Sequence, residues 1–318
     1  MRTQMMKTDC KITDLLKISL IILLSFSLTA CNVGSDQPDV TEDQLLADGS
    51  VAYLGPAGTY TEEATQFFFP QALAYLPKES VAEALKELQE GKVDYAVIPQ
   101  ENSLGGATIN YIAELIAAED IYVVGEVILP ISQTLMGIPG SSLSDIRLVV
   151  SHAQGLAQSA KWRQDNLPDA QSEEMASTAA AAEYVAASKD ISIAAVAAPG
   201  AAALYGLQVL AENVQISSAN RTRFYVLAKQ MRTGNHQRAV FIAECKAEEF
   251  DDIIVAIHAS GLELVTVHDL PEGSGLGSYH YIIEVEDPEG ISKKQIEKVL
   301  KIEQISFRGC FDWKEKGA

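Results

Sequence analysis

Residues 51–62 read VAYLGPAGTYTE, and this stretch carries the pattern that decides the fold. The apolar run Val51–Leu54 has the length of a short buried strand and leads into a turn that contains Gly and Pro. The turn ends at Thr59, and Glu62 follows at the spacing of a capping box, which predicts the start of a helix. A strand that opens directly into a helix is typical of α/β proteins with parallel strands.

The same strand-to-helix junction recurs along the chain. Each time, a short apolar run is followed by small or polar residues that can begin a helix. Residues 93–98 are followed by PQENSLGG (99–106), and residues 147–150 by SHAQ (151–154), again at capping-box spacing. Residues 191–197 are followed by Pro199, which suits a first helical turn. The repeated unit predicts several parallel strands with helices between them.

Several of these junctions are rich in hydroxyl and amide side chains, with Glu101 as the acidic exception. Free N–H groups and the helix dipole both favour an anion where a strand ends and a helix begins. The pattern therefore fits an anion site. The alternative for any single junction is that its Ser, Thr or Asn only caps a helix, a contribution of about 1 kcal/mol each.

The composition is that of an ordinary globular protein, with 318 residues, 47% of them hydrophobic and 21% charged. The formal net charge of −19 excludes nucleic acid as an expected partner, because an acidic surface repels a polyanion. A small anionic ligand is not excluded, because helix starts or single Arg residues can hold it.

The first 31 residues have the features of a bacterial export signal. Basic residues precede the apolar run Ile18–Leu28, and residues 28–31, LTAC, resemble the cleavage box of lipoproteins, so we expect lipidation at Cys31. An uncleaved anchor is the alternative, but the run is shorter than the roughly 20 residues that span a bilayer. The expected location is the periplasmic side of a bacterial membrane, and Asn32 favours the outer membrane.

Residues 32–50 are polar and acidic and show no periodic pattern of apolar residues, which predicts a tether between the lipid and the folded part. Beyond the signal segment only Cys245 and Cys310 remain. They fall on different predicted strands, so two buried free thiols are expected.

The C-terminal third has a different organisation. A polar stretch, residues 229–238, predicts a linker. After it come, in order, strand 239–245, helix 248–259, strand 262–267, Gly-rich loop 271–277, strand 279–286, helix 293–300 and strand 304–311. This βαββαβ order is the ferredoxin-like arrangement.

Five ordered segments between Val51 and Leu227 resemble those of prephenate dehydratases. They are VAYLGPAGT (51–59), PQENS (99–103), SHAQGLAQ (151–158, with Ala153 where the family has Pro), LYGL (204–207) and NRTRF (220–224). Residues Gly261–Leu264 resemble a segment of the regulatory ACT domain that follows in that family.

The resemblance implies a two-lobed catalytic domain, like a periplasmic binding protein, over residues 51–230. One lobe would hold about 51–125 plus 222–230, the other 126–216, and an ACT-like domain would hold 238–314. The expected assembly is a homodimer or tetramer.

The implied activity is loss of CO2 and water from prephenate, a small dianion, to give phenylpyruvate. By resemblance Thr222 donates to the leaving hydroxyl, while Asn102, Ser151 and Gln158 orient the substrate. Arg223 is a candidate carboxylate clamp, with an ion pair that fixes its strand as the equal alternative. Further substrate contacts are expected from Ser103, Thr59, Thr61, Thr178 and Phe224, with capping alone as the alternative for the three threonines.

No cofactor is implied, and no metal site is expected, because the His residues do not cluster at ligand spacing. His152 is expected to support a helix start rather than to transfer a proton. Residues 268–271, HDLP, stand where many members have E-S-R-P, so weak or absent control by phenylalanine is expected. Two other functions stay open: an arogenate or cyclohexadienyl dehydratase, and a non-catalytic solute-binding lipoprotein.

Overall fold

The structure is a computed structural model that describes residues 49–118, 120–217, 219–232, 234–273 and 276–317. The predicted export signal (1–31) with Cys31 lies outside these residues, as does nearly all of the tether. Both therefore stay predictions. Within the described ranges, no helix is long and apolar enough to cross a membrane.

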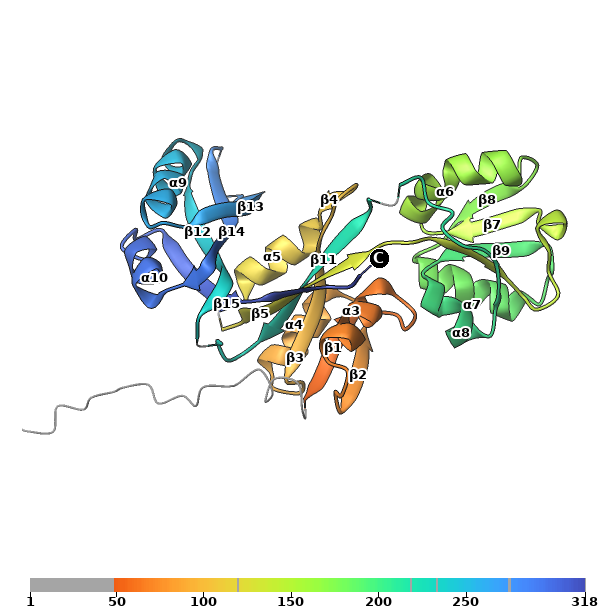
Figure 1. Cartoon of the computed structure of the whole chain (residues 1–318), viewed down its shortest axis with the longest axis horizontal. Helices are drawn as coiled ribbons and strands as arrows, with labels where there is room; N and C mark the ends of the chain where they lie inside the picture. The colour runs from red at the N-terminus through yellow and green to blue at the C-terminus, as the bar shows by residue number, and fades with distance from the viewer. Residues whose placement is uncertain (1–48, 119, 218, 233, 274–275, 318) are drawn as a thin grey trace, which may run out of the picture. The chain divides into compact units, whose positions relative to one another are not determined.

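The first lobe is built on a seven-stranded sheet with the order β16-β5-β11-β3-β1-β2 and β4 paired to β3 (Figure 1). Its strands are β1 (Ser50–Leu54), β2 (Ala74–Lys78), β3 (Tyr95–Asn102), β4 (Gly106–Ala107), β5 (Tyr122–Pro130), β11 (Arg221–Ala228) and β16 (Trp313–Glu315). β1 is parallel to β2 and β3, whereas the returning strand β11 is antiparallel to both β3 and β5. Helix α3 (Tyr60–Phe68) covers one face, and α4 (Val81–Gln89) and α5 (Ile109–Ala117) cover the other.

The second lobe has a five-stranded sheet with the order β10-β6-β9-β7-β8. Its elements are β6 (Thr134–Gly137), η1 (Leu143–Asp145), β7 (Leu148–Ser151), α6 (Ala153–Asn166), β8 (Gln171–Glu174), α7 (Thr178–Ser188), β9 (Ile193–Ala197), α8 (Pro199–Tyr205) and β10 (Gln208–Ala211). Helix α6 packs on one face, and α7 and α8 pack on the other (Figure 1). The chain is thus a mixed α/β protein, as predicted.

The boundary between the lobes lies later than the sequence suggested. β5 continues through Pro130 in the first sheet, because it pairs with β11 along its whole length. The chain therefore enters the second lobe after residue 130 and not at 125–126. A long apolar run cannot show by itself which sheet its second half joins.

The C-terminal third forms a four-stranded antiparallel sheet with the order β13-β14-β12-β15. Its elements are β12 (His236–Lys246), η2 (Ala247–Glu249), α9 (Phe250–Ala259), β13 (Glu263–Pro271), β14 (Ser278–Ile291), α10 (Lys293–Val299) and β15 (Ile305–Phe311). This is the predicted βαββαβ order. The predicted free thiols are confirmed: Cys245 and Cys310 are unpaired and buried.

The last strand, β16, was not predicted and does not belong to the C-terminal sheet. Trp313–Glu315 pairs in parallel with Glu126–Ile128 of β5 (Figure 1). Lys316 continues this contact through a backbone bond to the oxygen of Ile128 at 3.0 Å. Residues 313–316 therefore belong to the first lobe, and the domain assigned to 238–314 ends at about Asp312.

Local capping explains most helix starts. Thr59 accepts a hydrogen bond from the backbone N–H of Glu62, as its spacing predicted, and Ser80 accepts one from the N–H of Glu83. The start of α6 differs from the prediction, because its N-cap is His152, which accepts from the N–H of Gln154, and not Ser151. The predicted supporting role of His152 is thereby confirmed.

Candidate active site

The end of β3 pairs with the beginning of β11, and this pairing brings Asn102 opposite Thr222. Asn102 Nδ2 donates to Thr222 Oγ1 at 2.9 Å and to Asn220 Oδ1 at 2.8 Å. Both Asn102 and Thr222 are partly exposed, whereas Asn220 is completely buried. Two of the four residues predicted to be catalytic are therefore in direct contact.

The same site includes the loop after β3 and the start of α6. Ser103 holds the loop to the returning strand: its N–H donates to Arg221 O and its Oγ accepts from Arg221 N, both at 2.9 Å. Gln154, from α6 of the second lobe, donates to Asn102 Oδ1 at 3.4 Å. Asn102 thus links both lobes. Ser103 is exposed, and its Oγ also donates to Ala219 O at 3.3 Å, so all three of its described bonds serve the backbone.

A second group of predicted residues lies in the second lobe. Ser151 is completely buried, and its Oγ donates to Val196 O at 2.6 Å. A Cβ on Gly155 would lie 2.3 Å from Ser151 Oγ and 3.4 Å from Thr178 Cγ2, so these three residues pack together and require Gly at 155. Thr178 is not a helix cap, because Ser177 caps α7.

Gln158 is buried beside the segments that connect the two lobes. It is 6% exposed, its Oε1 accepts from Gln133 Nε2 at 3.0 Å, and its backbone oxygen accepts from Ile216 N at 2.8 Å. These partners come from the two segments that connect the lobes. In this structure Gln158 therefore ties those segments to α6.

Thr59 and Thr61 have different environments. Thr59 lines a hollow of about 610 Å³ between the starts of α3 and α8, which also includes Pro130 and Lys316. Pro130 pairs with Arg221, the neighbour of Thr222. Thr61 is only 5% exposed, and its backbone oxygen accepts from Thr65 Oγ1 at 2.7 Å.

Two residues predicted to bind substrate have structural contacts instead. All three guanidinium nitrogens of Arg223 face carboxylates: Nε faces Glu126, Nη2 faces Glu284, and Nη1 lies 3.4 Å from Glu101. The clamp is therefore wrong and the alternative, an ion pair that fixes the strand, is correct. Phe224 is 1% exposed within an apolar cluster of the first lobe, so it is a core residue.

The partners of Arg223 form a buried ionic cluster that joins the first lobe to the C-terminal domain. Arg238 of β12 also bonds to both Glu126 and Glu284. Neither carboxylate is exposed, and burial together with the neighbouring Glu284 raises the pKa of Glu126 well above its usual range. The cluster adjoins the site, because Arg223 follows Thr222.

His268 also connects the C-terminal domain to the site. It is 7% exposed, its Nδ1 contacts the hydroxyl of Tyr111, and its Nε2 lies 3.7 Å from the carboxylate of Glu101, the residue before Asn102. Burial is the largest effect on its imidazole and lowers its pKa.

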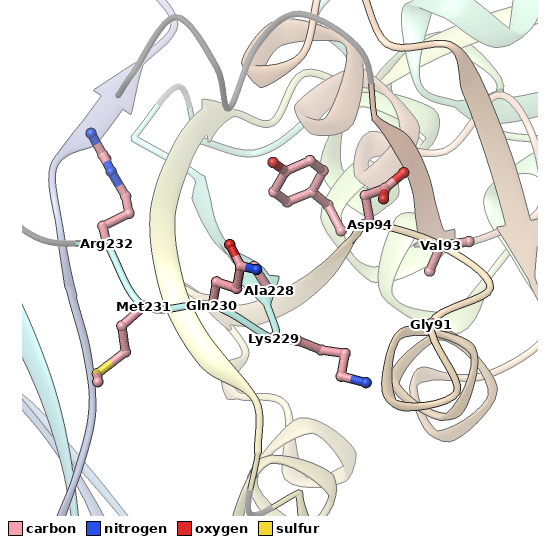
Figure 2. Close-up of a pocket in the computed structure, with 9 residues that line it drawn as sticks. Gly91, Val93, Asp94, Ala228, Lys229, Gln230, Met231 and Arg232 are labelled. Atoms are coloured by element: carbon pink, nitrogen blue, oxygen red, sulfur yellow. The ribbon is translucent and has the colours of Figure 1, made fainter. Parts of the chain in front are cut away.

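A separate hollow of about 320 Å³ lies at the other end of the same strands. It is lined by residues 91, 93–95 and 228–232, around the beginning of β3 and the end of β11 (Figure 2). Asn102 lies seven positions after Tyr95 along β3, roughly 20 Å at the usual rise. None of the predicted site residues lines this hollow.

Comparison with known proteins shows the family of this chain. The family model described as prephenate dehydratase matches residues 51–232, more than half of the chain. The chain belongs to the prephenate dehydratase family. The match contains every residue predicted to be catalytic or to bind substrate.

Relatives support the assignment along most of the chain. A bifunctional chorismate mutase/prephenate dehydratase of Aquifex aeolicus is 32% identical over 254 residues, covering 79% of this chain and 68% of the relative. Arogenate dehydratase 5 of Arabidopsis thaliana is 40% identical over 179 residues, covering 56% and 42%. The structure of a prephenate dehydratase with L-Phe from Arthrobacter aurescens is 25% identical, with a TM-score of 0.74, and covers 83% and 90%.

No spacing pattern in the sequence indicated the ionic cluster. Glu126 lies inside an apolar run and Glu284 alternates with apolar residues in β14, which in retrospect marks both as buried acids that need cationic partners. Among the described residues, no three His, Cys, Asp or Glu side chains are grouped as metal ligands.

Proposed function

We propose that Thr222 is the hydrogen-bond donor to the leaving hydroxyl when this member of the family converts prephenate to phenylpyruvate. The observation that carries the proposal is the bond from Asn102 Nδ2 to Thr222 Oγ1. A hydroxyl oxygen that accepts this bond still has its own proton to donate. Thr222 is partly exposed at the beginning of β11, so that proton can reach a ligand.

The reaction depends more on a correctly positioned hydrogen-bond donor than on a strong acid. The bond from the ring to its carboxylate carbon breaks, its electron pair enters the ring, and the hydroxyl on the opposite carbon leaves with its bonding pair and a proton to form water. Aromatisation supplies the driving force. A positioned donor stabilises the charge that develops on the leaving oxygen, a contribution of about 10²-fold or more in rate.

Several groups are available to hold the dianion. Thr59 lies at the start of α3 in the larger hollow, and Ser177 with Thr178 forms the start of α7. The amide of Gln154 lies beside Asn102. We propose that these helix starts hold the carboxylates, because their N–H groups favour anions and the guanidinium of Arg223 is already paired.

Arogenate is the second candidate substrate. It differs from prephenate in carrying an amino group where prephenate has a keto oxygen, and the Arabidopsis relative is named for it. Comparison of kcat/KM on the two substrates distinguishes the possibilities, since that ratio measures discrimination between competing substrates.

We further propose that residues 236–312 form an ACT-like regulatory domain. The βαββαβ topology and the resemblance at Gly261–Leu264 support this. His268 and Leu270 stand in place of the acidic and basic residues of E-S-R-P, so weak control by phenylalanine follows. We also propose a homodimer or tetramer, attached to the periplasmic side of a bacterial membrane through lipid on Cys31.

The decisive assay follows phenylpyruvate formation by the protein without residues 1–31, with a chelator present. Prephenate turnover above the uncatalysed rate is the expected result. If the folded protein binds prephenate but forms no phenylpyruvate, the solute-binding alternative replaces the enzyme. Turnover that requires an added metal would contradict the cofactor-free mechanism.

A further inference from the structure

Asn220 occupies a central position beside the Thr222 site. It lies just before β11, on the segment that returns from the second lobe, and it is completely buried. Its backbone oxygen accepts from the N–H of Ile131, on the segment that leaves the first lobe, at 2.9 Å. The two connecting segments therefore meet at this residue.

The backbone fixes the orientation of the Asn102 amide. The N–H groups of Leu104 and Gly105 both point at Asn102 Oδ1, each at 3.0 Å. A backbone N–H can only donate, so this end of the amide must be the oxygen. The NH2 end of Asn102 therefore faces Asn220 and Thr222.

The two protons of Asn102 Nδ2 have three acceptors within reach. Asn220 Oδ1 is nearest at 2.8 Å, Thr222 Oγ1 lies at 2.9 Å, and the backbone oxygen of Arg221 lies at 3.2 Å. With Asn220 accepting one proton, the best remaining acceptor is the Thr222 hydroxyl.

The other half of the Asn220 amide is unused. Its Nδ2 is buried and has no hydrogen-bond partner among the described residues. A buried donor without a partner destabilises the fold. The NH2 group therefore does not account for an Asn at position 220. The described side-chain hydrogen bond of this residue is the one that Asn220 Oδ1 accepts from Asn102 Nδ2.

We propose that Asn220 is a positioning residue for the dehydration. It accepts one proton of Asn102 Nδ2 and thereby directs the other onto Thr222 Oγ1. The Thr222 oxygen then acts as an acceptor toward Asn102, and its own proton is left to face the leaving hydroxyl of the substrate. This inference rests on the proposed function of Thr222.

A double-mutant cycle tests the inference, with prephenate as the substrate and residues 1–31 removed from every variant. Asn220→Ala should lower kcat about tenfold and change KM by less than about threefold, because the orientation matters mainly in the transition state. In a Thr222→Val background the same change should alter kcat by less than about twofold, since the hydroxyl that it orients is gone.

Ser217→Ala is the matched control. It removes a side-chain bond to the N–H of Ala219 in the same segment and should leave kcat unchanged. If Asn220→Ala fails to fold, Asn220→Asp tests the same point, because it keeps an oxygen acceptor at the same reach. For Asn220→Asp, a kcat within about threefold of the parent supports the proposal, and a kcat about tenfold lower overturns it.

The outcomes separate the two proposals. Equal losses from Asn220→Ala in the parent and in the Thr222→Val background would overturn the positioning role, as would no loss in either. If Thr222→Val alone kept the parental kcat, the proposed function of Thr222 would fail, and the role of Asn220 with it.

Discussion

Glu284→Gln tests whether the buried ionic cluster holds the C-terminal domain to the catalytic strand. Glu284 lies on β14 with no exposed surface. One of its oxygens faces Arg223 and Arg238, and the other accepts from the Tyr225 hydroxyl at 2.7 Å and Gln100 Nε2 at 3.3 Å. These partners donate to both oxygens, so whichever end of a Gln carries the NH2 meets donors.

The expected cost follows from this geometry. Removing one partner of a buried ion pair costs about 3–5 kcal/mol. Glu126 still faces both arginines in the variant, so the lower end applies, and we expect a loss of about 3 kcal/mol in the free energy of unfolding.

Glu286→Gln is the matched control, because it lies two residues along β14 and faces the same Arg238 at 3.5 Å, but its side chain is 38% exposed. An exposed pair contributes about 0–1 kcal/mol. Urea unfolding of the parent and both variants gives the comparison. Equal effects from the two variants, or a loss below about 1 kcal/mol for Glu284→Gln, would refute the reasoning.

Three further predictions concern other parts of the chain. The pKa of Glu126 is raised from 4.5 to about 7, so between these pH values the folded protein keeps a proton that the unfolded chain has released. The free energy of unfolding should therefore fall as the pH rises from 4.5 to about 7. Glu126→Gln should flatten that fall in urea titrations; an unchanged slope would assign it to other groups. Cys31→Ser should abolish metabolic labelling with a fatty acid, whereas persistent labelling would disprove the lipid site. Phenylalanine should inhibit weakly or not at all, because Leu270 stands where the family has Arg; strong inhibition at micromolar concentrations would contradict this reasoning.

The sequence predicted the features that depend on neighbouring residues. The cap at Thr59 lies three residues from its partner, and the βαββαβ order follows from alternating runs of ordinary length. These choices are local, so a single sequence contains them. The family resemblance then identified Asn102 and Thr222, whose direct contact the structure shows.

The errors arose where distant residues decide the outcome. Arg223 meets Glu284, 61 residues away in the chain, and no spacing rule indicates that pairing. Strand β16 is short, carries charged residues and gains its strand form only by pairing with β5. His152 replaced Ser151 as a cap because Ser151 is bonded to Val196 in the sheet.

The value of kcat for Thr222→Val on prephenate tests the central claim most directly. Val keeps the β-branched shape of Thr and deletes only the hydroxyl, so the fold should be retained while the donor is lost. We predict a kcat lower by about 10²-fold or more, with a smaller effect on KM, and partial activity in Thr222→Ser. A Thr222→Val kcat within about threefold of the parent, roughly 0.7 kcal/mol of barrier, would contradict the role of Thr222 as the donor.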